Sequence, residues 1–131
     1  MILFFSKYKT IFVASNFCLI ILYLFPGSLI GCFLYNDCGI QPQVTSNFFN
    51  ISSNHYYAFF ILSFLGFFSY WFSKNLIFIL IYLIILSILI EYLHYIVPNR
   101  TFQYEDLFGN LYGVISASIL LILIKIYAKF K

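Results

Sequence analysis

Four long apolar segments, set apart by short polar stretches, constrain this chain more than any other feature of its sequence. They cover approximately residues 10–34, 55–73, 76–97 and 107–124. A helix needs about 20 predominantly apolar residues to cross the hydrocarbon core of a bilayer. With 63% hydrophobic and 8% charged residues, the chain has too few polar side chains to cover a water-soluble domain. The sequence therefore predicts an all-α fold, a four-helix transmembrane bundle that forms one domain over residues 1–131.

The connections between the segments predict how the helices follow one another. Only Lys74 and Asn75 separate the second and third segments, so these two helices should be antiparallel neighbours. Residues 98–106 join the third and fourth segments. Pro98 should end the third helix, because proline lacks a backbone N–H and clashes with the preceding turn.

The basic residues predict the orientation of the bundle. With this helix order, one side of the membrane would carry Lys7, Lys9, Lys74, Lys125, Lys129 and Lys131. Arg100 alone falls on the other side. The positive-inside rule then places both termini in the cytoplasm and the loops at 26–54 and 98–106 outside. The basic clusters are too small to indicate a nucleic-acid partner.

Two cysteines of the long outer loop leave alternatives open. Cys32 and Cys38 could form a disulfide in an oxidising space or remain free thiols. The "LIGC" stretch that ends at Cys32 also fits a lipoprotein cleavage box, in which residues 1–31 would be a removable signal. The Pro-Gly interruption and the length of the segment favour a retained helix.

Unusual polar residues gather where the last three segments approach the outer side. One helical stripe of the third segment carries Ser87, Glu91, His94 and Pro98, spaced by four, three and four. Asp106 and Asn110 open the fourth segment and His55 opens the second. Glu91 would lie on the order of 9 Å below the Pro98 end of its helix, where an isolated carboxylate is costly. We therefore expect it to be paired, protonated or directed into a polar cavity.

Small residues on the fourth segment predict a close helix contact. Gly109, Gly113 and Ala117 recur every four residues, a pattern that allows another helix backbone to approach. We expect this row to pack against the third helix. Arg100 should then fold back to meet Glu91 or Asp106, since a guanidinium binds a carboxylate in a bidentate manner.

Each polar residue also has a structural interpretation. Asp106 or Thr101 could cap the fourth helix, Glu105 could be solvated, and Asn110 could simply bond between helices. His55 and His94 could both be residues of the membrane interface. A metal site would need Glu91 and His94 together with His55 and Asp106, but the ExxH spacing is short and common, so the sequence predicts no metal and no cofactor.

The residues at the outer side resemble the signature of VanZ-like membrane proteins. The pattern ExxHxxxPxRxxxxxDxxxNxxG runs from Glu91 to Gly113, with HYYAFF from His55 and FPGS from Phe25 upstream. Two departures stand out. The family usually has Gln where this chain has His94, which argues against His94 as a metal ligand, and it usually has Asp-Lys where Ile51 and Ser52 stand.

The resemblance implies a multi-pass protein of the bacterial plasma membrane, in a family whose best-known member lowers susceptibility to teicoplanin. We expect an outer-leaflet pocket that binds the head of a membrane lipid or lipid-linked envelope precursor. The pocket would contain His55, Glu91, His94, Arg100, Asp106 and Asn110. Arg100 would meet a phosphate or carboxylate, with Glu91 holding it in place. Two alternatives remain: a membrane enzyme with Glu91 or His94 as acid or base, and a structural protein without a ligand.

Overall fold

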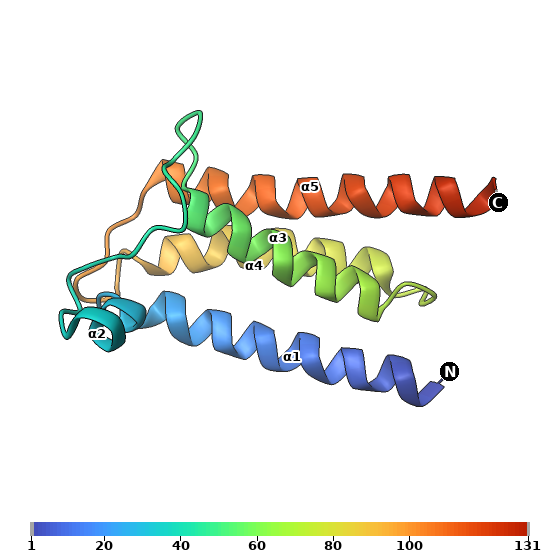
Figure 1. The fold of residues 1–131 in the computed structure, drawn as a ribbon, viewed down its shortest axis with the longest axis horizontal. Coiled ribbons are helices and arrows are strands. Elements are labelled where there is room, and N and C mark those ends of the chain that lie inside the picture. The colour runs from blue at the N-terminus through green and yellow to red at the C-terminus, as the bar shows by residue number, and fades with distance from the viewer. Residues whose placement is uncertain (1, 131) are drawn as a thin grey trace.

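The computed structural model describes residues 2–130, with side chains from Tyr8 onward. Within this range the chain forms five helices: α1 (Ile2–Leu24), α2 (Leu29–Tyr35), α3 (Ser53–Ser69), α4 (Leu76–Leu93) and α5 (Tyr104–Lys129). The four long helices lie side by side, and the short α2 folds across one end (Figure 1). No β-strand occurs in the described residues, where Phe48 and Ile51 form only an isolated bridge. The prediction of an all-α fold is confirmed.

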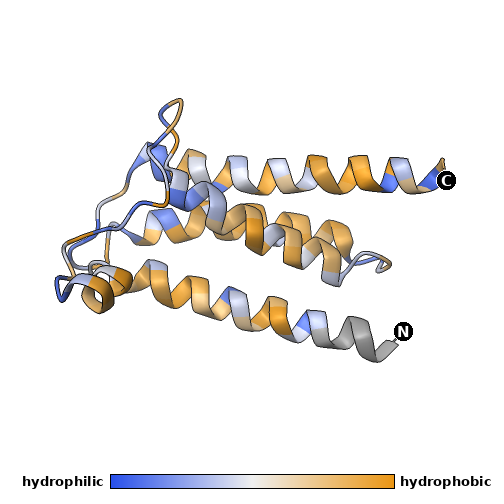
Figure 2. Cartoon of the chain, in the orientation of Figure 1, coloured by the Kyte–Doolittle hydropathy of each residue, from blue (hydrophilic) through white to orange (hydrophobic). Residues whose placement is uncertain are grey.

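Apolar residues make up most of the long helices where the structure describes them (Figure 2), and many of these residues are exposed. Phe78 and Ile85 of α4 are 67% and 56% exposed, and Ile122 and Leu123 of α5 are exposed to a similar degree. α4 and α5 are each long and apolar enough to cross a membrane, and α1 with α2 makes a third span if the bent pair counts as one. Because soluble monomers rarely expose such continuous apolar surface, the chain is a membrane protein.

The first predicted segment is not continuous. Expected over 10–34, it breaks after Leu24, and α2 turns by 80° from the axis of α1. Gly27 makes this turn possible, because its φ of 86° lies in a region that other residues avoid. Cys32 of α2 forms a disulfide with Cys38, which settles the alternative between a disulfide and free thiols. The lipoprotein interpretation requires a free sulfur on Cys32, but this sulfur is bonded to Cys38.

The bounds of the other helices also differ from the prediction. α3 has 17 residues and ends at Ser69, not at 73. α4 ends at Leu93 rather than 97, and the chain then tightens into turns in which the N–H groups of His94, Tyr95 and Ile96 each bond three residues back. This fits Pro98, since a proline disfavours helical geometry at the residue before it. α5 is longer than predicted at both ends.

The two ends of the bundle differ in polarity. The start of α1, the end of α5 and the connection at 70–75 lie at one end, opposite α2, the loop at 36–52 and the α4–α5 connection (Figure 1). Lys9, Lys74, Lys125 and Lys129 therefore share one end, and Arg100 lies at the other, as the sequence predicts. Lys131 falls outside the described residues.

α3 and α5 form the most extensive interface of the bundle. Gly109 and Gly113 face α3, and a Cβ atom added to Gly113 would lie 2.6 Å from the Tyr56 carbonyl oxygen. Ala117, the third member of the row, is fully buried. The expectation that this row packs against the third helix, α4, is therefore wrong. The spacing of the small residues identified a close contact but could not identify the partner helix.

Candidate functional site

Asn110 of α5 connects all four long helices near the loop end of the bundle. Its side chain is fully buried. The amide nitrogen donates to the Ser87 carbonyl of α4 at 3.2 Å, and the amide oxygen accepts from His55 Nδ1 of α3 at 3.1 Å. The Tyr23 hydroxyl of α1 makes a longer contact with the same oxygen, at 3.5 Å. One amide thus supplies the interhelical bonds that a buried polar group requires.

His55 is buried among these partners and is not an interfacial residue. Because the Asn110 oxygen can only accept a hydrogen bond, the proton of a neutral His55 ring belongs on Nδ1. Nε2 then presents a lone pair, and it lies 3.5 Å from Oδ2 of Asp106. The structure therefore joins His55 and Asp106, which the sequence places on different helices.

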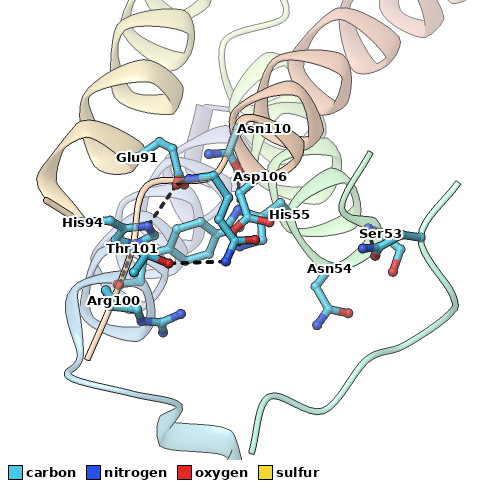
Figure 3. A network of polar contacts seen from close by, with 12 residues as sticks. Ser53, Asn54, His55, Glu91, His94, Arg100, Thr101, Asp106 and Asn110 are labelled. Carbon is cyan, nitrogen blue, oxygen red and sulfur yellow. Dashed lines mark hydrogen bonds and ion pairs between the residues drawn. The ribbon is translucent and has the colours of Figure 1, made fainter. Parts of the chain in front are cut away.

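Glu91 lies in the last turn of α4 and is fully buried. Its Oε1 accepts the backbone N–H of Gln103 at 2.9 Å and lies 3.2 Å from Nδ1 of His94. Its Oε2 is buried with no hydrogen-bond partner among the described residues. Only one of the two carboxylate oxygens of Glu91 therefore has a hydrogen-bond partner in the described residues. The carboxyl group points toward the side chains of Asp106 and His55 (Figure 3).

His94 is oriented by α1. Its Nε2 lies 3.1 Å from the Tyr23 carbonyl oxygen, and because a carbonyl only accepts, Nε2 must carry a proton. The other ring nitrogen faces Glu91. The imidazole is 1% exposed, so it is a packed residue of the cluster and not an anchor at the membrane interface.

Arg100 does not meet a carboxylate as the sequence suggested. Its Nε and Nη2 donate to the carbonyl oxygens of Phe25 and Leu22, each at 3.3 Å. These carbonyls belong to the end of α1, where the helix leaves acceptors unpaired and a positive charge is favourable. No ion pair of Arg100 occurs in the described part of the chain. Partial burial lowers the pKa of Arg100, while the negative charges of the Asp106 and Glu91 carboxylates oppose this effect.

The start of α5 also differs from the expectation. Gln103 is the N-cap residue, and its side chain makes no capping hydrogen bond. Thr101 and Asp106 are therefore not the N-cap. Glu105 is exposed, as its solvated interpretation predicts. The carboxylate of Glu91 instead accepts the N–H of Gln103 from the neighbouring helix.

Sequence reasoning missed Tyr23. Its ring lies 4.7 Å from the His55 ring and 6.4 Å from the His94 ring, measured between centroids. The chain is so rich in aromatic residues that a single tyrosine carries little information. The only signal was its place just before the Pro-Gly break, at the same end as the other polar residues.

An apolar cavity of about 300 Å³ lies at the opposite end of the bundle, lined by Phe64, Phe68, Trp71, Phe72, Leu121 and Ile124. It does not coincide with the polar cluster formed by His55, Glu91, His94, Asp106 and Asn110. That cluster is packed, and its partly exposed rim is formed by Asp106 and the adjacent Arg100. A ligand would therefore reach the cluster through this rim.

The structure thus brings together five of the six residues that the sequence singled out. Arg100, the sixth, lies in the α4–α5 connection and bonds to the end of α1. Compared with known proteins, the chain matches no family model, no curated protein and no solved structure. The VanZ-like resemblance accordingly rests on the residues quoted for it.

Proposed function

We propose that this chain is a multi-pass protein of the bacterial plasma membrane that binds the anionic head of an amphiphile in the outer leaflet. The observation that carries the proposal is the position of Arg100. Its guanidinium is half-buried at the rim of the polar cluster and is fixed by two carbonyls of α1. A guanidinium has five N–H donors, and the donors that these two bonds leave can meet a phosphate or carboxylate.

The orientation follows from two independent features. Lys9, Lys74, Lys125 and Lys129 lie at the end where α1 begins and α5 ends, which the positive-inside rule assigns to the cytoplasm. The disulfide between Cys32 and Cys38 lies at the opposite end, and disulfides persist in oxidising compartments outside the cytoplasm. Both features support an orientation in which the polar cluster lies at the outer side, and we propose that the four long helices cross the bilayer in this orientation.

The apolar faces of the helices provide the second half of the binding surface. A lipid chain can lie along the exposed residues of α4 and α5 while its head reaches the rim. The VanZ-like resemblance is the basis for proposing an envelope lipid or lipid-linked precursor as the source of the head, and for a link to teicoplanin tolerance. In this arrangement Glu91 holds the start of α5 and faces His94, instead of holding Arg100.

Native mass spectrometry of the gently solubilised protein tests this function. The wild type should retain a defined phosphate- or carboxylate-bearing lipid, and Arg100→Ala should lose it. Lys125→Gln is the matched control, because Lys125 also donates to a backbone carbonyl at 3.3 Å, that of Trp71, but at the other end of the bundle. The same lipid profile in all three proteins would contradict the proposal.

A further inference from the structure

Three potential metal ligands converge inside the polar cluster from three different helices. His55 of α3, Glu91 of α4 and Asp106 of α5 each offer one ligand atom, and these atoms lie within 4.8 Å of one another. Figure 3 shows the three side chains in the same region of the cluster. The sequence analysis considered these three residues together with His94 and predicted no metal. Their separations of 36 and 15 positions along the chain (55 to 91, and 91 to 106) do not show that the three side chains meet.

The hydrogen bonds around His55 leave two acceptors facing each other. Asn110 Oδ1 accepts a hydrogen bond from the Nδ1–H group of His55, at 3.1 Å. The amide is correctly oriented for this, since its nitrogen donates to the Ser87 carbonyl. Nε2 of a neutral His55 therefore directs a lone pair at Oδ2 of Asp106, 3.5 Å away. Two acceptors at this separation require a positive charge, either a proton or a metal ion, between them.

Glu91 supplies an independent observation. Its side chain is 0% exposed, and its Oε2 is buried without a hydrogen-bond partner in the described residues. An unpaired carboxylate oxygen is costly in a membrane interior. A proton shared between His55 and Asp106 leaves this oxygen unsatisfied, whereas a cation placed among the three ligands can satisfy all of them together.

We propose that His55, Glu91 and Asp106 bind one divalent transition-metal ion, with Zn²⁺ as the first candidate. An imidazole nitrogen with two carboxylate oxygens suits Zn²⁺, Mn²⁺ or Fe²⁺, whereas Mg²⁺ and Ca²⁺ prefer oxygen ligands alone. The two positive charges of the ion balance the carboxylates of Asp106 and Glu91. The separate acceptor pair formed by His94 Nδ1 and Glu91 Oε1, 3.2 Å apart, needs one further proton. Asn110 acts as the positioning residue, since its oxygen fixes the His55 tautomer that exposes Nε2.

This site does not depend on the lipid proposed above. The metal is held by protein ligands alone, and it can be measured without any lipid. A bound metal ion would neutralise the carboxylates of Asp106 and Glu91, which lie near Arg100. It would therefore favour the binding of an anionic head group at the rim.

The test uses full-length protein purified with a tag that contains no histidine, stripped with EDTA and titrated with ZnCl₂. Bound zinc is measured by mass spectrometry after dialysis. The wild type should bind about one equivalent, and His55→Ala and Asp106→Asn should bind at least about tenfold more weakly, a loss comparable to that from removing a metal's supporting residues. Glu105→Gln, which removes an exposed carboxylate next to Asp106, is the matched control and should bind like the wild type.

A second measurement does not need the variants to fold. ZnCl₂ should raise the melting temperature of the wild type, while MgCl₂ at the same concentration should not, because a ligand that binds only the folded state stabilises it. Absence of a zinc-specific shift, or equal zinc binding by wild type, His55→Ala and Asp106→Asn, would overturn the proposal and leave a proton between His55 and Asp106.

Discussion

Glu91 of α4 accepts the backbone N–H of Gln103, the residue that precedes α5, at 2.9 Å. In a capping box, the third residue of a helix reaches back to this N–H. That position in α5 is occupied by Asp106, which instead lies beside His55. The Glu91 carboxylate of α4 thus takes the place of a capping-box residue at the start of α5. Asp106 does not make that bond and contacts His55 in the polar cluster.

Two substitutions of Glu91 should show how much of its contribution to stability comes from accepting a hydrogen bond and how much comes from its charge. Glu91→Ala leaves the Gln103 N–H without its acceptor and removes one side of the contact with His94. We expect a loss of about 3–5 kcal/mol in the free energy of unfolding, as for a broken buried pair. Glu91→Gln keeps an acceptor oxygen and should lose less than half of that amount. Denaturant unfolding in detergent measures both, and equal losses would contradict the assigned role.

The contact between α5 and α3 should tolerate no side chain at Gly113. A Cβ atom there would lie 2.6 Å from the Tyr56 carbonyl oxygen and 2.8 Å from the Phe60 nitrogen. Since these are backbone atoms, the helices must move apart, and we expect Gly113→Ala to destabilise the protein by about 1–3 kcal/mol. Ser118→Ala, also on α5 and bonded only to its own helix, is the control and should change stability by less than about 0.5 kcal/mol. A neutral Gly113→Ala would mean that the helices are farther apart than described.

Arg100 should stabilise the end of α1 equally at all pH values near neutrality. Partial burial lowers its pKa, and nearby negative charges oppose the change. A lowered pKa means that the folded chain gives up this proton first, so the stabilisation can change only in strongly alkaline solution, near the ordinary range of arginine. The difference in melting temperature between wild type and Arg100→Ala should therefore be constant from about pH 6 to about pH 9. A difference that varies across this range would show that a titrating neighbour controls the contact.

The cysteines should react in a fixed ratio. The chain contains three, of which Cys32 and Cys38 form a disulfide and Cys18 is free. In SDS without reductant, a maleimide-polyethylene glycol reagent should add once per chain, and after reduction it should add three times. Three additions without reductant would remove the disulfide and with it one of the two arguments for the outward orientation.

Much of the fold could be predicted from the sequence because the membrane simplifies the problem. Apolar length locates the long helices, and the lysines separate one end of the bundle from the other. The meeting of Glu91, His94, Asp106 and Asn110 near His55 was expected because helix lengths place these residues at one depth. Helix bounds were less accurate, since they depend on local turns such as the one at Gly27.

The partners within the cluster could not be predicted in the same way. Helical periodicity shows which residues share a face but not which neighbouring helix covers it, so the glycine row was assigned to α4 and not to α3. Arg100 was assigned a carboxylate because side-chain charges are visible in a sequence, whereas the carbonyls of Leu22 and Phe25 that it binds are not. Tyr23 escaped notice for a related reason, because its contact with His94 is made by its backbone carbonyl.

The most direct measurement of the central claim is the lipid occupancy of Arg100→Lys, determined beside its melting temperature. Lysine keeps the positive charge but lacks the planar guanidinium group, whose several N–H donors can bond two carbonyls and an anionic head group at the same time. We predict that Arg100→Lys remains folded, with a melting temperature close to that of the wild type, and carries several-fold less of the bound lipid. Wild-type lipid occupancy in this variant, or a loss of lipid that only follows a loss of folding, would contradict the account and leave the polar cluster as a structural connection between helices.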